Sequence, residues 1–262
     1  MIFWNDMQPS IQTKSASRDS SEAPPNALLP SICIYAWMAL WTAVVFALEA
    51  LPFVIGLCLP KWPRRWVMRH LALFWGTVIV RFATWPFIRV RRTGEAPIAE
   101  PAIFVCNHRS AFDAFLVAVV GKAMIQGVND WPLKLPLVGF VARQAGYLDI
   151  TDQPYEEICE EIRQARAHGI SVVVFPEGHR SGDSPLQNFR SGIFHAARTL
   201  GMPIQPIVIS GNQRIPDMRF RMAPGRIQVE ILPAVSSEAI LAFPNAFTLK
   251  QHVRSAMMLR GA

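Results

Sequence analysis

Long apolar stretches fill the early part of the chain. Residues 31–60, SICIYAWMALWTAVVFALEALPFVIGLCLP, contain Glu49 as their single charge. Their uncharged first part, residues 31–48, reaches the ~18 apolar residues that a membrane span needs. Glu49 and Pro52 interrupt the remainder of the stretch, which favours a kinked helix or a span that continues into an interfacial segment.

A second apolar stretch, LALFWGTVIVRFATWPFIRVRR, comes after the basic connector KWPRRWVMRH. Arg81 divides it, and because a charge at mid-membrane is costly we expect this stretch to lie in the membrane interface. The tryptophans and basic residues around it suit an interfacial belt and anionic headgroups. Residues 31–92 are therefore expected to form a membrane-associated helical segment, with burial of both stretches in a soluble protein as the open alternative.

Residues 1–30 differ from this segment in composition. They are rich in Ser, Pro, Ala and Asn, as in SASRDSSEAPPNALLP, and show no apolar period. Such a sequence buries too little apolar surface to fold, so it predicts a disordered tail.

From residue 93 onward, short apolar runs alternate with helical patterns. The runs PAIFVC, ISVVVF, MPIQPIVISG and RIQVEILP predict strands. The segments AFDAFLVAVVGKAMI, YEEICEEIRQARAHG and FRSGIFHAARTLG predict helices, the last two stopped by Gly169 and Gly201. This alternation predicts an α/β domain over residues 93–262, with a mixed, largely parallel sheet flanked by helices and preceded by the membrane-associated helices.

Charge and cysteine content narrow the choice of function. The 262 residues are 51% hydrophobic and 17% charged, with a formal net charge of +7. This balance suits an anionic membrane surface or an anionic substrate better than nucleic acid, because the basic residues cluster beside tryptophan-rich apolar segments. An excess of basic residues after residue 60 predicts that the α/β domain faces the cytoplasm from an inner or cytoplasmic membrane. The four cysteines lack metal-ligand spacing, which favours a reduced compartment without disulfides.

The segment FVCNHRSAFDAF combines a histidine with a carboxylate at the end of an apolar run. His108 and Asp113 would lie about 140° apart on a continuous helix, so they can meet only if His108 precedes the helix. Ser110 and Asp113 have the spacing of a capping box, which predicts a helix that begins at Ser110. Asp113 could then keep one ring nitrogen protonated and free the other as a base. The structural alternative is a cap acid beside a loop histidine.

A second polar turn, in VVVFPEGHRSG, ends the strand predicted at residues 170–175. Gly178 permits close backbone approach, and Arg180 offers a planar fork suited to a phosphate. Both polar turns come directly after apolar strands, and open α/β sheets bind ligands at strand ends. The alternative is an ordinary surface turn with an incidental arginine.

Taken together, the two turns resemble a known family. NHRSAFD fits Asn-His-x-Ser-x-x-Asp, and FPEGHRS resembles Phe-Pro-Glu-Gly-Thr-Arg-Ser, in the order found in the 1-acyl-glycerol-3-phosphate acyltransferase (lysophosphatidic acid acyltransferase) family of glycerolipid acyltransferases. NFRSG, PIQPIVISG and LKLPLVGFVARQAGYLDI are similar to further blocks of that family. The likeness extends over roughly residues 68 to 235.

The resemblance implies a membrane-bound O-acyltransferase without a covalent acyl-enzyme. His108 would take the proton of a lysophospholipid hydroxyl that attacks an acyl thioester, supplied as acyl-CoA or on acyl-carrier protein, and Asp113 would orient the imidazole. Glu177, Gly178 and Arg180 match the block that binds the acceptor's phosphate. The resemblance implies no metal and no organic cofactor.

Departures from the family pattern concern the acceptor. His179 stands where threonine is usual, and Asp152 where arginine is common. The first expectation is 1-acyl-glycerol-3-phosphate giving phosphatidic acid, and the alternative is a lyso-aminolipid of the ornithine-lipid type. Two other classes stay open: a serine hydrolase using Ser110 with His108, which lacks a G-x-S-x-G elbow, and a non-catalytic membrane-binding protein.

Overall fold

A mixed sheet forms the centre of the protein. The computed structural model describes residues 28–129, 133–134, 136–150 and 153–262. The strands found there are β1 (Ile88–Gly94), β2 (Ile103–Cys106), β3 (Ile125–Val128), β4 (Leu148–Asp149), β5 (Val172–Val174), β6 (Ile204–Ser210) and β7 (Gly225–Ile231). Within the described residues these seven strands have the order β1-β7-β6-β2-β5-β3-β4. All neighbouring pairs are parallel except β6 with β7. The predicted fold class is confirmed.

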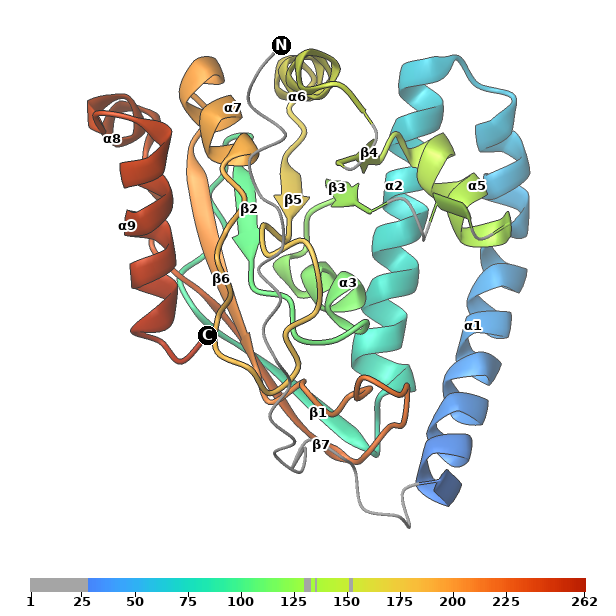
Figure 1. Ribbon diagram of the computed structural model, residues 1–262. Helices are drawn as coiled ribbons and strands as arrows, with labels where there is room; N and C mark the ends of the chain where they lie inside the picture. Colours follow the sequence, from blue (N-terminus) through green and yellow to red (C-terminus); the bar gives the residue numbers. More distant parts are fainter. Residues whose placement is uncertain (1–27, 130–132, 135, 151–152) are drawn as a thin grey trace.

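Helices cover both faces of this sheet (Figure 1). They are α1 (Leu28–Leu57), α2 (Lys61–Val78) with its π-helical extension η2 (Ile79–Ala83), α3 (Asp113–Leu116) with the 3-10 turn η3 (Val117–Val120), α5 (Pro136–Ala145), α6 (Tyr155–Ala167), α7 (Gly192–Leu200), α8 (Ser237–Ala242) and α9 (Ala246–Met258). Side chains alternate across β2, so Ile103 and Val105 join the core under α6, α7, α8 and α9, whereas Phe104 and Cys106 join the core under α2 and α3.

The helices α6 and α7 end where their sequences predict. Gly169 and Gly201 come just after them with φ of 72° and 56°, in the left-handed region that glycine adopts without steric cost.

The helix predicted from Ser110 to Ile125 is wrong in length. α3 starts at Asp113 and passes into η3, which stops at Gly121 with φ of 76°. Ile125 already belongs to β3, which pairs with β5. Gly121 ends the helical turn, and pairing of Ile125 and Gln126 with β5 outweighs the helical apolar spacing of the segment.

The predicted membrane-associated segment overlaps the sheet. α1 and α2 are helical as expected, but Ile88–Gly94 forms β1, which pairs in parallel with β7. The boundary predicted between residues 92 and 93 therefore falls inside a strand. Of the predicted tail at residues 1–30, all but the last three residues lie outside the described part of the chain, and those three begin α1.

α1 lies along the α/β domain with much of its apolar surface exposed. By length and composition it is the one described helix that could cross a membrane. Ser31 accepts a hydrogen bond from the Met222 backbone near its start, and Phe53 packs on Phe140 of α5 near its end, with ring centroids 6.3 Å apart. Its exposed large apolar side chains are Leu28, Leu29, Ile32, Tyr35, Leu40, Val44, Phe46, Leu48, Leu51, Val54 and Ile55.

Candidate active site

The two polar turns meet at one edge of the sheet. β2 and β5 are parallel neighbours, so the turns at the ends of both strands lie at the same edge. The Glu177 carboxylate accepts a hydrogen bond from the His108 backbone N–H at 2.6 Å. The Ser181 backbone N–H donates to the His108 carbonyl at 2.8 Å. The expected proximity of the two motifs is thus present in the structure.

His108 and Asp113 are in direct contact. The His108 Nδ1 atom lies 2.9 Å from Asp113 Oδ2, and the Asp113 side chain is fully buried. Because Asp113 Oδ2 also accepts two backbone N–H groups, Nδ1 is the donor in this contact, which leaves the Nε2 lone pair free in the neutral ring. The His108 ring packs against Phe175 with centroids 4.7 Å apart, which fixes its plane.

Asp113 also holds the turn that carries His108. Its Oδ2 atom accepts the backbone N–H groups of Arg109 at 2.7 Å and Ser110 at 2.9 Å, and Oδ1 accepts the Asn212 side-chain amide. Together with the His108 ring, these donors hold the carboxylate in one position. This arrangement supplies the acidic half of the predicted capping box.

The serine half of that box is absent. The Ser110 hydroxyl donates to the Ile215 carbonyl at 2.7 Å and accepts from the Phe112 backbone N–H at 3.1 Å. Ser110 is fully buried. Its hydroxyl is therefore engaged in binding the β6–β7 loop and is not placed as a nucleophile, which argues against the serine hydrolase.

Glu177 and Gly178 shape the second turn from within. Glu177 is buried, and its Oε2 atom accepts the Gln187 backbone N–H at 2.9 Å while Oε1 accepts that of His108. Gly178 has φ of 76°, and a Cβ atom there would lie 2.6 Å from Arg190 Nε. Glu177 therefore links the His108 turn to the backbone at Gln187. Because Gly178 has no side chain, Arg190 can approach the turn closely.

Arg180 contributes a cation with an unused donor to this turn. Its Cζ atom lies over the Phe220 ring, 4.8 Å from the centroid. Among the described residues, no acceptor bonds its buried NH1 atom. His179, its neighbour, is exposed, and both side chains line one cavity.

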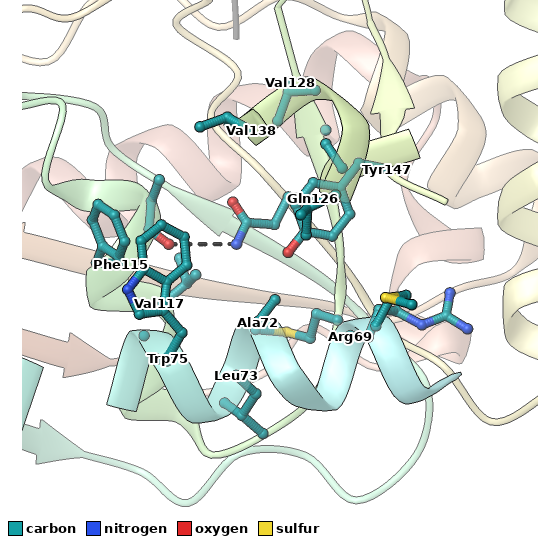
Figure 2. Close-up of a pocket in the computed structure, with 18 of the residues that line it drawn as sticks. Arg69, Ala72, Leu73, Trp75, Phe115, Val117, Gln126, Val128, Val138 and Tyr147 are labelled. Carbon is teal, nitrogen blue, oxygen red and sulfur yellow. Dashed lines mark hydrogen bonds between the residues drawn. The ribbon is translucent and has the colours of Figure 1, made fainter. Parts of the chain in front are cut away.

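A cavity of about 830 Å³ has both polar and apolar parts in its lining. His108, His179 and Arg180 line one part of it, and the remaining lining is mostly apolar. Figure 2 shows side chains of α2, α3, β3 and α5 around it, with Gln126 Nε2 donating to the Ala114 carbonyl at 3.4 Å. The labelled lining residues are Arg69, Ala72, Leu73, Trp75, Phe115, Val117, Gln126, Val128, Val138 and Tyr147. A polar group facing a long apolar hollow suits a substrate with an acyl chain.

Three residues of the site, Asn212, Phe220 and Arg190, are not predicted from the sequence. Asn212 and Phe220 belong to the β6–β7 loop, far along the chain from Asp113 and Arg180, which they contact, and no local motif marks them. Arg190 lies in NFRSG, whose likeness to a family block is a usable signal.

Two further expectations concern Asp152 and metal binding. Asp152, which departs from the family pattern, lies outside the described residues. Within the described part of the chain no cluster of three His, Cys, Asp or Glu could hold a metal ion.

The sequence is similar to known acyltransferases. Residues 87–210 match the family model described as Acyltransferase. The chain is 27% identical over 195 residues to the 1-acyl-sn-glycerol-3-phosphate acyltransferase of Limnanthes alba, covering 64% of this chain and 69% of that protein. It is 29% identical over 174 residues to the protein of the same name from Salmonella typhimurium, covering 64% and 70%.

A solved structure shares the fold. The crystal structure of the 1-acyl-sn-glycerophosphate acyltransferase from Thermotoga maritima matches with a TM-score of 0.73 at 20% identity. The match covers 90% of this chain and 98% of that one.

Proposed function

We propose that this chain, whose residues 87–210 match the Acyltransferase family model, transfers a fatty acyl group to the free hydroxyl of 1-acyl-sn-glycerol-3-phosphate, giving phosphatidic acid. The observation that carries this proposal is that His108, which is paired with the buried Asp113, lines the same cavity as Arg180. A base, a phosphate-binding cation and an apolar hollow match three parts of the two substrates: hydroxyl, phosphate and acyl chain.

His108 acts as the general base. Its Nε2 atom takes the proton of the acceptor hydroxyl while the hydroxyl oxygen attacks the carbonyl carbon of the acyl thioester. The C–S bond then breaks, and His108 returns the proton to the departing thiolate. Asp113 holds the protonated Nδ1 throughout and stabilises the imidazolium that forms between the two proton transfers.

Arg180 binds the acceptor's phosphate. Its unpaired NH1 atom supports this role, because a guanidinium donor buried without a partner is costly unless a ligand fills it. Gly178 supplies the close backbone turn, and Arg190 beside it supplies a second cation. Glu177 serves the site by holding the His108 turn, and its negative charge makes direct phosphate contact unfavourable.

The donor and the membrane belong to the same proposal. The apolar cavity takes the acyl chain of a thioester carried by coenzyme A or by acyl-carrier protein, and no described residue distinguishes the two. The exposed apolar side chains of α1 support attachment to the membrane that holds the lipid acceptor. The excess of basic residues after residue 60 favours an α/β domain in the cytoplasm. A lyso-aminolipid acceptor is the second candidate, favoured by His179 at the cavity rim.

The test measures transfer of a labelled acyl group by membranes containing the protein. Donors are acyl-CoA and acyl-carrier protein, and acceptors are lysophosphatidate and a lyso-aminolipid. His108→Ala is expected to lower kcat by about 10² to 10⁴. Arg180→Ala is expected to raise the lysophosphatidate KM by about 10- to 150-fold.

Matched controls come from exposed residues of the same types. His195→Ala on α7 and Arg163→Ala on α6 are expected to leave both constants unchanged. Full activity of His108→Ala would refute the mechanism. Transfer to the lyso-aminolipid in preference to lysophosphatidate would replace the acceptor and keep the chemistry.

A further inference from the structure

The loop between β6 and β7 connects the active site to α1. At its start, Asn212 donates to the buried Asp113 carboxylate. Further on, the Phe220 carbonyl accepts the Tyr35 hydroxyl of α1 at 2.9 Å, and Ser31 of α1 bonds both backbone groups of Met222. One loop therefore contacts the acid that holds His108 and the first two turns of the long apolar helix.

Phe220 has an unfavourable backbone conformation in this loop. Its φ of 60° makes it the one non-glycine residue with positive φ in the described part of the chain. Such a conformation costs free energy for a bulky side chain, so it persists only where its surroundings impose it, and such residues cluster at ligand-binding and catalytic sites.

Asp217 imposes the conformation. Its Oδ1 atom accepts the backbone N–H groups of Arg219 and Arg221, both at 2.9 Å, and its Oδ2 atom accepts Arg221 Nε at 3.0 Å. Burial alone would raise the pKa of Asp217, but these hydrogen bonds hold it below its usual value, so the carboxylate is ionised at neutral pH. The turn around Phe220 is thus closed by a charged side chain.

The Phe220 ring carried by this turn is not buried in the hydrophobic core. Phe220 is 49% exposed, and its ring face contacts the Arg180 guanidinium at 4.8 Å. A cation held over an aromatic face keeps its N–H donors at its edge, available to a ligand, whereas a carboxylate partner would occupy them. This explains how Arg180 is held without losing the unpaired NH1.

We propose that Phe220 is a positioning residue that holds the Arg180 guanidinium for the acceptor's phosphate. Asp217 and Tyr35 keep the ring in place, so the N-terminal helix contributes to acceptor binding through this contact. The proposal rests on the phosphate-binding role proposed for Arg180.

The experiment compares ring and non-ring substitutions at Phe220 in membrane-embedded full-length protein. Phe220→Leu keeps an apolar side chain but removes the π face, and it is expected to raise the lysophosphatidate KM by about 2- to 30-fold. The donor KM and kcat are expected to stay within about twofold. Phe220→Tyr is expected to restore the parent KM, because it keeps the ring.

Two further arms separate this proposal from the assignment of Arg180. In an Arg180→Ala background, Phe220→Leu is expected to add nothing to the acceptor KM, since the cation it positions is gone. With 1-acylglycerol, which lacks the phosphate, Phe220→Leu is expected to behave as the parent. If Arg180→Ala leaves the lysophosphatidate KM unchanged, the assignment of Arg180 fails. If Arg180→Ala raises it and Phe220→Leu does not, Phe220 has no positioning role.

A structural role alone predicts a different result. Loss of loop structure would lower kcat for both acceptors through Asn212 and Asp113, and that outcome would overturn the proposal. Phe220→Gly and Phe220→Ala provide the check on folding. Both lose the ring and share the raised KM, but glycine tolerates positive φ, so Phe220→Gly is expected to melt about 2–4 °C above Phe220→Ala.

Discussion

At the scale of single residues, the buried carboxylate of Asp113 holds the site together by accepting several hydrogen bonds at once. Asp113 receives the His108 ring, two backbone N–H groups and the Asn212 amide. The same side chain therefore sets the tautomer of His108, the proposed base, and the path of the turn that carries it. This dual role makes the charge of Asp113 more important than its shape.

Substitution of Asp113 by Asn is expected to lower kcat by about 10²- to 10⁴-fold. An amide of the same size presents N–H donors where the carboxylate accepts, so Nδ1 loses its partner and Nε2 no longer remains the free base. The measurement is kcat at saturating donor and acceptor, with binding of lysophosphatidate measured alongside. A variant that keeps the parent kcat would show that the His108 tautomer does not limit the reaction.

At the scale of elements, α2 forms one wall of the cavity with a buried arginine in its middle. Arg69 is 2% exposed, and no described residue bonds its NH1 or NH2 atom. Burial, together with the nearby charge of Arg65, lowers the pKa of Arg69 to about 10. A base whose folded-state pKa is lowered costs stability while it is charged, which includes neutral pH. Arg65, one turn earlier, is paired with Glu161 at 2.8 Å.

The two arginines of α2 predict opposite effects on stability. Arg69→Met removes an unpaired buried charge and keeps most of the volume, so it is expected to stabilise the protein by about 1–4 kcal/mol at pH 7. Arg65→Met is the matched control, and it is expected to destabilise because it removes the 2.8 Å partner of Glu161 and leaves only the longer contact with Lys61 at 3.8 Å. Thermal unfolding in detergent provides the measurement. A lower melting temperature for Arg69→Met than for Arg65→Met would mean that Arg69 is paired in solution.

Local sequence patterns predict those elements that are defined locally. The apolar runs of β2, β5, β6 and β7 and the stops of α6 and α7 are visible in the sequence. β1 escapes prediction because its arginines and its distance from β7, more than 130 residues later, hide a pairing that only the folded chain makes. β3 escapes for the same reason, since its partner β5 lies beyond α6.

The site residues also divide into those marked by local motifs and those placed by long-range contacts. His108, Asp113 and Arg180 stand in short motifs, and the first two are in contact because His108 precedes α3, as the predicted turn requires. Asn212 and Phe220 act on those residues from a loop that carries no motif. The motif by itself predicts that Glu177 binds the acceptor's phosphate. In the structure its carboxylate instead accepts backbone N–H groups of His108 and Gln187 and so links two loops.

At the scale of the whole molecule, α1 is attached to the α/β domain at both ends. Its first turns bond Phe220 and Met222, and its last turns pack on α5. If the domain stays on one side of the bilayer, both ends of α1 stay on that side too. The helix then lies in one leaflet with its exposed apolar side chains in lipid.

Cys33 and Cys58 test this arrangement directly. Both are exposed, and they lie about 37 Å apart along α1 and its end. A membrane-impermeant maleimide is expected to label both from the cytoplasmic side, in inverted vesicles but not in sealed right-side-out ones. Cys106 and Cys159 are buried and are expected to stay unlabelled. Labelling of Cys33 and Cys58 from opposite sides would establish a full span.

The position of α1 also has a consequence for producing the protein. An obvious route to a water-soluble version is to delete the long apolar helix and express the rest. Phe46, Ala50 and Phe53 of that helix line the cavity beside His108, and the Tyr35 hydroxyl donates to the loop beside Arg180. Truncation would therefore open this cavity along with removing the exposed apolar surface of the helix, so solubility is better sought by replacing outward-facing residues such as Leu48 and Leu51 with polar ones.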